Sequence, residues 1–284
     1  MCWLRAPCGA RCAGPATVRD DGPSYTARGV AVARSLLQRP STPTGDPDAD
    51  DRLTATLAEG FARAERRADD IDRFLAYIRV RTQFFDNAVL DAISARIPQV
   101  VILGAGYDGR ALRFRTPGVR FFEVDHPATQ RDKRERLVAV GAPVEDIAFV
   151  AADFTRRGLA TALQIGGHDR SQASLFVCEG VLRYLPAEWA RALLRTAADA
   201  AAPTSRFAIS ISTREFSAGD ATWSTDRERQ RQLAAIGEPV LTVPDRATAL
   251  QWLHDAGWSA ITVEEVASSA PGTRPGRLLV TARR

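Results

Sequence analysis

The stretch QVVILGAGYDGRALRFRTPGVRFFEVD, residues 99–125, decides the fold. Its first five residues, 99–103, are apolar on every side, rich in β-branched side chains and too few for a helix, which is the pattern of a buried parallel strand. A second such run, 119–124, is closed by Asp125. The segment between the two runs begins with a glycine-rich turn and continues with a helical pattern. The stretch therefore predicts a βαβ unit with a nucleotide pocket at its mouth.

The turn itself reads GAGYDG, residues 104–109. Gly104 and Gly106 can adopt positive φ and carry no Cβ, so a ligand can lie against the backbone of the turn. Apolar residues from Ala111 onward predict a helix directly after the turn. The free N–H groups at the start of that helix would point at the same ligand.

Asp125 lies 21 residues after Gly104, at the carboxyl end of the second strand. A carboxylate in this place can accept hydrogen bonds from the two ribose hydroxyls of an adenosine. Two cofactors fit such a unit. The spacing Gly104-x-Gly106-x-x-Gly109 is the fingerprint of NAD(P), and the same geometry binds S-adenosylmethionine. The choice between them depends on the rest of the chain.

The composition is that of a globular protein. Its 45% hydrophobic and 25% charged residues are ordinary values, and no apolar run approaches the roughly 18 residues of a membrane span. The net charge of +4 comes almost entirely from arginine, with Lys133 the sole lysine. Because charges of both signs are interleaved, they indicate solvated helix faces. We expect a cytoplasmic protein that binds neither nucleic acid nor membrane.

Residues 1–23 are predicted to form a disordered leader. Cys2, Cys8 and Cys12 lie in it without a histidine nearby, so the sequence predicts no metal site. Val18 is an alternative start of the native protein.

Residues 24–284 are predicted to form one domain, with an N-terminal helical cap over 24–97 and the core over 98–284. The helices expected in the cap are 24–38, with Ser24 or Thr26 as its N-cap, 53–61, and 70–95 as one helix or two. Arg79 and Arg81 lie in the last of these and cannot share a helix face. One is expected to face solvent and the other to face inward, toward an anion.

The core alternates strands with helices, which predicts a Rossmann-like, doubly wound α/β sheet that is mostly parallel. Further strands are expected at 146–151, 173–179 and 206–212, with helices at 127–140, 155–165 and 187–202. The tail is expected to hold helices at 216–236 and 245–256 and strands at 259–266 and 277–282. The linker between these last strands is too short for a helical crossover, so the sheet is predicted to end in an antiparallel hairpin.

Six segments carry a family likeness: SYTARGVAVAR (24–34), RTQFFDNAV (81–89), VVILGAGYDGRALRF (100–114), FFEVDHPATQRDK (121–133), DF (153–154) and EGVLRYLP (179–186). With them the chain resembles the class I S-adenosylmethionine-dependent methyltransferases. More narrowly, it is similar to the leucine carboxyl methyltransferase-like family and its actinobacterial O-methyltransferase branch. The resemblance covers roughly residues 24–284. It departs from the family at Gly109, where Ser or Thr is usual, and at Phe154, where Leu is common.

The resemblance implies one cofactor site at the carboxyl edge of the sheet. It implies that Gly104, Ala105 and Gly106 lie against the methionine part of the cofactor, that Arg81 binds the cofactor carboxylate and that Glu179 lies beside the sulfonium. It also implies that Asp125 holds the ribose and that Asp153 and Phe154 contact the adenine. His126 directly follows Asp125 and is expected near the ribose.

The sequence thus predicts an S-adenosylmethionine-dependent methyltransferase that acts on a hydroxyl or carboxyl oxygen of a small molecule. A carboxylate acceptor needs no general base, whereas an alcohol or phenol benefits from one. The candidate bases are His126, His168, His254, Glu179 and Tyr184, and none of them is assigned a catalytic role. The alternative is an NAD(P)-dependent oxidoreductase, which rests on the glycine spacing alone and lacks the expected Tyr-x-x-x-Lys set. A non-catalytic cofactor-binding protein is a third possibility.

Overall fold

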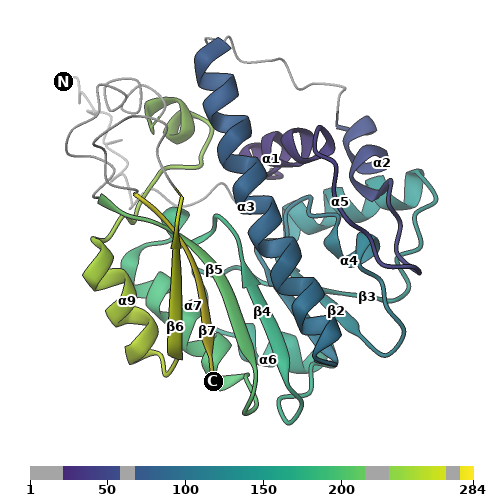
Figure 1. Cartoon of the computed structure of the whole chain (residues 1–284). Coiled ribbons are helices and arrows are strands. Elements are labelled where there is room, and N and C mark those ends of the chain that lie inside the picture. The colour runs from purple at the N-terminus through teal and green to yellow at the C-terminus, as the bar shows by residue number, and fades with distance from the viewer. Residues whose placement is uncertain (1–21, 58–67, 215–229, 267–275) are drawn as a thin grey trace, which may run out of the picture.

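Within residues 22–57, 68–214, 230–266 and 276–284, the part of the chain that this computed structural model describes, seven strands form one sheet (Figure 1). The strands are β1 (Gln99–Leu103), β2 (Arg120–Asp125), β3 (Ile147–Ala151), β4 (Ser174–Cys178), β5 (Arg206–Ser212), β6 (Ser259–Glu265) and β7 (Arg277–Arg283). Their order across the sheet is β3-β2-β1-β4-β5-β7-β6. The first five strands are parallel, whereas β7 runs antiparallel to both β5 and β6. The predicted parallel sheet with an antiparallel C-terminal hairpin is therefore confirmed.

Helices cover both faces of the sheet. One face carries α1 (Tyr25–Ser35), α2 (Ala49–Ala55), α3 (Ala68–Ser94), α4 (Arg110–Arg113) and α5 (Pro127–Ala139). The other face carries α6 (Leu159–Ile165), α7 (Ala187–Asp199) and α9 (Arg246–Asp255). A short 3-10 turn, η1 (Leu182–Tyr184), follows β4. In Figure 1, α3 crosses the front of the sheet as one continuous helix, which decides between the one or two helices expected there.

The alternation of side chains along β1 shows why a fully apolar strand is needed between two helical layers. Val101 and Leu103 pack into the cluster beneath α6, α7 and α9. Val100 and Ile102 pack into the cluster beneath α1, α3 and α5. All four are buried, so the strand has no solvent-facing side, as expected for the centre of a parallel sheet.

Two helix starts follow from local sequence. The Ser24 hydroxyl accepts a hydrogen bond from the N–H of Ala27 at 3.1 Å and caps α1, as predicted. The Asp245 carboxylate accepts one from the N–H of Thr248 at 2.7 Å and caps α9.

Two predicted helix starts are wrong. Helix α6 begins at Leu159 rather than at 155, because the Asp153 carboxylate accepts a hydrogen bond from the N–H of Thr155 and forms a local turn instead. Helix α2 begins at Ala49 rather than at 53, which places acidic residues in its first turn, where the helix dipole favours them.

Several predicted features fall wholly or partly outside the described residues. They include residues 1–21 of the predicted leader, residues 58–61 of the second predicted helix and residues 216–229 of the predicted helix 216–236. Residues 230–235 of that helix are helical. Among the helices that the structure describes, none is long and apolar enough to cross a membrane.

Candidate functional site

The residues that the sequence singled out lie at the carboxyl edge of the sheet. The turn 104–106 follows β1, Asp125 ends β2, Asp153 follows β3 and Glu179 follows β4. The chain winds outward in opposite directions from the neighbouring strands β1 and β4. This edge therefore contains the switch point of the sheet, where ligands of α/β proteins bind.

The glycine turn is tight and closely covered. Gly104 and Gly106 have φ of +70° and +48°, which side chains other than glycine rarely adopt. The carbonyl oxygen of Val124 accepts hydrogen bonds from two N–H groups of the turn, at 2.8 and 3.0 Å. A Cβ on Gly104 would lie 2.3 Å from the side chain of Val181, and a Cβ on Gly106 would lie 2.8 Å from that of Ala27 on α1. The predicted need for glycine at both positions is explained by conformation and by space.

The Asp125 side chain is fixed by hydrogen bonds from two backbone N–H groups, one of which belongs to the glycine turn. One carboxylate oxygen accepts a hydrogen bond from the N–H of Gly106 at 2.5 Å, and the other accepts one from the N–H of His126 at 2.7 Å. Burial raises the pKa of Asp125 above its ordinary value, against the opposite effect of these two bonds. Each oxygen keeps a lone pair, so the carboxylate can still accept two hydroxyl groups.

His126 has a structural role that the sequence did not predict. Its Nδ1 accepts a hydrogen bond from the N–H of Ala128 at 3.3 Å, so His126 is the N-cap of α5. The residue nevertheless lies beside Asp125, as expected.

Asp153 and Phe154 follow β3 at the same edge. One oxygen of Asp153 accepts hydrogen bonds from the N–H and the hydroxyl of Thr155, at 2.8 and 2.7 Å. The other oxygen forms an ion pair at 3.0 Å with Arg156, whose side chain is exposed. The ring of Phe154 packs against the core cluster beneath α6 and α7. A ligand that binds this second oxygen of Asp153 would therefore compete with the exposed side chain of Arg156.

The helix predicted after the turn is present but short. Helix α4 is a single turn of four residues, and the N–H of Arg110 donates to the carboxylate of Asp108 at 2.9 Å instead of pointing at a ligand. Gly109 has a φ of −87°, so its conformation does not require glycine. A Cβ there would lie 2.7 Å from a carboxylate oxygen of Asp50. Glycine at position 109, the third glycine of the NAD(P) fingerprint, is thus explained by the close packing of Asp50 against it.

Glu179 is enclosed by guanidinium groups. Its carboxylate forms ion pairs with Arg34 at 2.6 Å, Arg81 at 2.7 Å and Arg110 at 2.7 Å, and its side chain is only 4% exposed. Burial alone would raise the pKa of Glu179, but Arg34, Arg110 and Arg81 outweigh it and hold the pKa well below the usual range.

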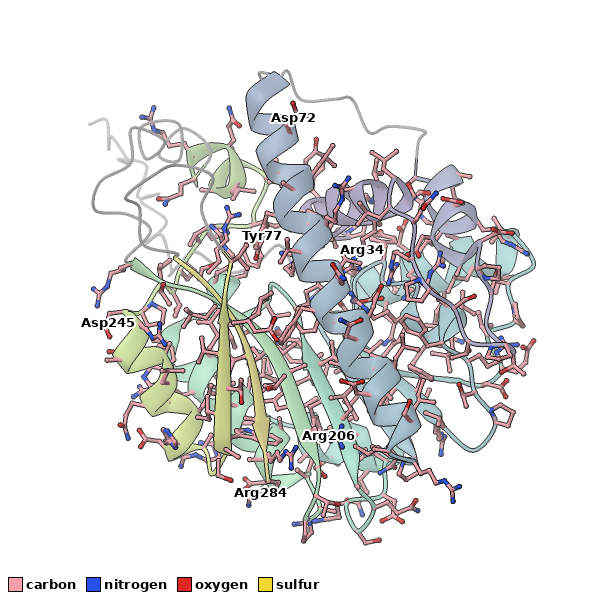
Figure 2. All side chains as sticks on the ribbon, in the orientation of Figure 1. Arg34, Asp72, Tyr77, Arg206, Asp245 and Arg284 are labelled. Carbon is pink, nitrogen blue, oxygen red and sulfur yellow. The ribbon has the colours of Figure 1, made fainter. Side chains whose placement is uncertain are left out.

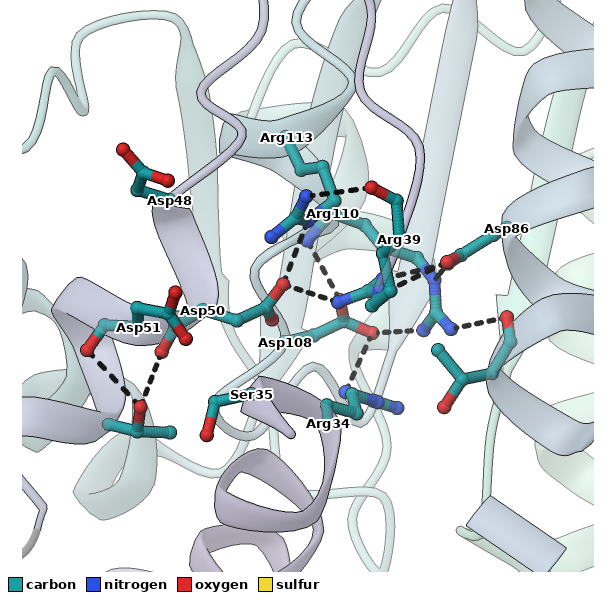
Figure 3. A network of polar contacts seen from close by, with 12 residues as sticks. Arg34, Ser35, Arg39, Asp48, Asp50, Asp51, Asp86, Asp108, Arg110 and Arg113 are labelled. Carbon is teal, nitrogen blue, oxygen red and sulfur yellow. Dashed lines mark hydrogen bonds and ion pairs between the residues drawn. The ribbon is translucent and has the colours of Figure 1, made fainter. Parts of the chain in front are cut away.

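A wider charge network joins this site to the helical cap, and Figure 3 shows the part of it around Asp50, Asp86 and Asp108. It comprises Arg34, Arg39, Arg81, Arg110 and Arg113 on the basic side and Asp50, Asp86, Asp108 and Glu179 on the acidic side. At its centre, Arg110 is fully buried and contacts Asp86 at 2.7 Å and Asp108 at 2.6 Å in addition to Glu179. Of these residues, the sequence predicted only Arg81 and Glu179 as part of the site.

A sequence signal for the network was present but is weak. Asp86 follows the buried Phe85 on the inward face of α3, and Arg110 and Arg113 flank the apolar pair at 111 and 112. Charged residues within core-facing segments are rarely buried without a partner. They therefore indicate mutual ion pairs, although the pattern does not tell which residues pair.

Arg81 is the inward-facing arginine of the pair considered in the sequence. It is 7% exposed, whereas Arg79 faces solvent. Burial lowers the pKa of Arg81, but Glu179 and the side chain of Tyr77 outweigh it and raise the pKa. The predicted division between one inward and one outward arginine is confirmed.

Some buried atoms around Glu179 have unused hydrogen-bonding capacity. These are Oε1 of Glu179, Nε of Arg34 and Nε of Arg81, none of which makes a hydrogen bond. Although Arg81 Nε and Glu179 Oε1 are 2.7 Å apart as an ion pair, their angle is not that of a hydrogen bond. These unused donors and this unused acceptor can therefore bind one further group that both donates and accepts hydrogen bonds.

Replacing Asp108 with asparagine is expected to remove a pH-dependent part of the stability. Burial alone would raise the pKa of Asp108, but Arg110 and Arg34 lower it to about 2. A carboxylate with a lowered pKa in the folded state stabilises the fold above its unfolded pKa, and this stabilisation is lost as the pH falls. The stability gap between wild type and Asp108→Asn should therefore narrow by about 2 kcal/mol from about pH 5 toward pH 2.

The measurement is thermal unfolding followed by circular dichroism across that pH range. Asp146→Asn is the control, because the Asp146 side chain is 73% exposed and its stability curve should run parallel to that of the wild type. A constant gap for Asp108→Asn would show that this carboxylate is not held ionised.

Known proteins are similar to this chain in sequence. The family model described as leucine carboxyl methyltransferase matches residues 31–198. A protein of Mycolicibacterium gilvum, named as an S-adenosyl-L-methionine-dependent methyltransferase, is 32% identical over 82% of this chain and 83% of its own. A Mycobacterium tuberculosis protein named in the same way is 34% identical over 82% of this chain and 79% of its own.

Solved structures agree at the level of the fold. A crystal structure of a Streptomyces avermitilis protein covers 92% of this chain and 98% of its own with a TM-score of 0.57 and 17% identity. A protein of an O-methyltransferase family from Burkholderia thailandensis covers 90% of this chain and 72% of its own, with a TM-score of 0.50 and 18% identity. At such low identity, these two likenesses concern the fold alone.

Proposed function

Because this chain belongs to the leucine carboxyl methyltransferase family, we propose that it transfers a methyl group from S-adenosylmethionine to a hydroxyl or carboxyl oxygen of a small acceptor. The dependence on S-adenosylmethionine follows from the family and its relatives. What we propose beyond this is that the methyl group goes to an oxygen atom and that the acceptor is a small molecule.

The charge balance of the buried network carries the assignment of the cofactor. Among the residues that the structure describes, five guanidinium groups of this network face four carboxylates, which leaves one positive charge in excess. Buried charges need partners, so an excess cation calls for an anion. The amino-acid end of S-adenosylmethionine brings a carboxylate for the free N–H groups of Arg34 and Arg81 and an ammonium group for the free oxygen of Glu179. The residues present therefore fit this cofactor.

The adenosine end is assigned to the neighbouring strands. We assign the ribose to Asp125, with His126 beside it, and the adenine to Asp153 and Phe154. The turn from Gly104 to Gly106 supports the methionine part, because its small residues let a ligand approach the backbone. Asp125 suits the ribose because both of its oxygens keep a free lone pair.

The site favours an acceptor that is already ionised. The cofactor supplies a methyl group activated on a sulfonium, so the protein has only to bind, orient and exclude water. Glu179 is a poor general base, because its pKa is held well below the usual range. A carboxylate or an acidic phenol needs no base, whereas an aliphatic alcohol would.

Calorimetric titration tests the cofactor. We expect S-adenosylhomocysteine to bind with a micromolar Kd, about −8 kcal/mol, and NADH and NADPH not to bind. Binding of a nicotinamide cofactor in its place would contradict the proposal and revive the oxidoreductase alternative.

The class of acceptor is tested with methyl-labelled S-adenosylmethionine and a panel of small carboxylic acids, phenols and alcohols. A methyl ester releases its label as methanol in mild alkali, whereas a methyl ether keeps it. We expect labelled product from acids or phenols. Label transferred only to nitrogen or sulfur would refute O-methylation while leaving the family assignment intact.

A further inference from the structure

Tyr77 contacts two guanidinium groups at the carboxyl edge of the sheet. Its ring centroid is 5.1 Å from Cζ of Arg81 and 3.9 Å from Cζ of Arg277. Tyr77 comes one helical turn before Arg81 on α3, and Arg277 opens β7 opposite Ser212 of β5. Figure 2 labels Tyr77 beside α3, above the strands. The ring thus joins the helical cap to the C-terminal hairpin beside the proposed cofactor site.

Arg81 reaches the strand end that also carries Glu179. Its Nη1 lies 3.5 Å from the position that a Cβ on Gly180 would occupy, directly after Glu179 in the chain. The side chain is long and has several rotatable bonds, so one ion pair does not fix the orientation of its planar head. An unconstrained guanidinium would be free to turn fully onto the Glu179 carboxylate and to satisfy both Nε and the carboxylate without a ligand.

The ring of Tyr77 opposes that rotation. A guanidinium on an aromatic face is held there by cation–π attraction. At the spacing i, i+4, the two side chains project from the same face of α3. Arg277, whose Cζ lies 3.9 Å from the ring centroid, also restricts the ring itself. Arg81 is consequently held with its Nε hydrogen unused, although Glu179 is only 2.7 Å away.

We infer that Tyr77 is a positioning residue, which holds the guanidinium of Arg81 in the orientation that receives the carboxylate of the cofactor's amino-acid end. Tyr77 acts through Arg81 and does not itself contact the reacting atoms. The inference rests on the proposed function, because it takes S-adenosylmethionine as the ligand of this edge.

The test compares two ligands that differ at the amino-acid end. S-adenosylhomocysteine carries the amino and carboxylate groups, whereas 5′-methylthioadenosine lacks both and keeps the adenosine and the sulfur. Calorimetry is performed on the full chain. Tyr77→Leu is expected to weaken the binding of S-adenosylhomocysteine about tenfold and to leave that of 5′-methylthioadenosine within about twofold. Tyr77→Phe keeps the ring but removes the hydroxyl, which also interacts with Arg81 and raises its pKa, so its affinity for S-adenosylhomocysteine should lie between those of the wild type and Tyr77→Leu.

The outcomes separate positioning from general support of the fold. Equal weakening of both ligands would overturn the inference, since it would mean that Tyr77 only stabilises the site as a whole. Unchanged binding of both would overturn it as well. If Tyr77→Leu does not fold, Tyr77→Met replaces the ring with a flexible side chain and tests the same difference. Failure of the proposed function looks different, because the wild type itself would not bind S-adenosylhomocysteine, and the inference would fall with it.

Discussion

Replacing Asp125 with alanine is expected to weaken the binding of S-adenosylhomocysteine at least about 100-fold. The change removes an acceptor for both ribose hydroxyls, and hydrogen bonds to a charged group contribute about 1.5–3 kcal/mol each. It also leaves the N–H groups of Gly106 and His126 without their acceptor, so the turn loses its support. A factor of 100 corresponds to about 2.8 kcal/mol, which these losses readily supply.

Calorimetry with two ligands makes this prediction specific. Asp125→Ala should lose affinity for S-adenosylhomocysteine and for 5′-methylthioadenosine alike, because both contain the ribose. That result would contrast with Tyr77→Leu, which should weaken the binding of S-adenosylhomocysteine but not that of 5′-methylthioadenosine. Asp146→Ala serves as the matched control, since Asp146 is an exposed aspartate at the opposite end of the neighbouring strand β3. Retained micromolar affinity in Asp125→Ala would mean that the ribose is held elsewhere.

Replacing Arg110 with methionine is expected to lower the free energy of unfolding by about 3–5 kcal/mol. Arg110 is fully buried and contacts three carboxylates, those of Asp86, Asp108 and Glu179. Methionine fills much of the same space but leaves these carboxylates in a low-dielectric interior with one cation fewer. Breaking a buried ion pair in this way is far more harmful than replacing both partners together.

Urea unfolding measures this loss, with Arg214→Met as the control. Arg214 forms an ion pair with Asp245 at 3.1 Å, but its side chain is 65% exposed, and exposed pairs contribute about 1 kcal/mol or less. If Arg110→Met lost no more stability than Arg214→Met, the remaining arginines would have to satisfy all of the carboxylates by themselves.

The elements that the sequence predicted correctly are those set by local chemistry. The apolar run at 99–103 could only be a strand buried on both sides, and the observed β1 is buried along its whole length. The positive φ of Gly104 and Gly106 follows from a tight turn between a strand and the next element. The short linker before 277 allowed only a hairpin, and β6 and β7 are antiparallel.

The charge network could not be predicted because it depends on contacts between segments that are distant in the sequence. Arg113 binds Asp50, and Arg34 binds Glu179, across different helices and loops. No periodicity links such pairs. The shortness of α4 was not predicted either, and here the contact is local, because the first N–H of the helix donates to the carboxylate of Asp108 two residues earlier. The assignment of individual residues to the cofactor stays a prediction until binding is measured.

The ion pair between Arg34 and Glu179 has a consequence for how the protein is made. Arg34 lies on the first described helix, whereas Glu179 follows the fourth strand. During translation, α1 leaves the ribosome long before β4 has been synthesised, so Arg34 lacks this partner until four of the seven described strands have been made. Native contacts between such distant segments form late and slow down folding. Amino-terminal fragments that end before β4 would therefore lack one of the two carboxylates that Arg34 contacts, Glu179, and keep only Asp108.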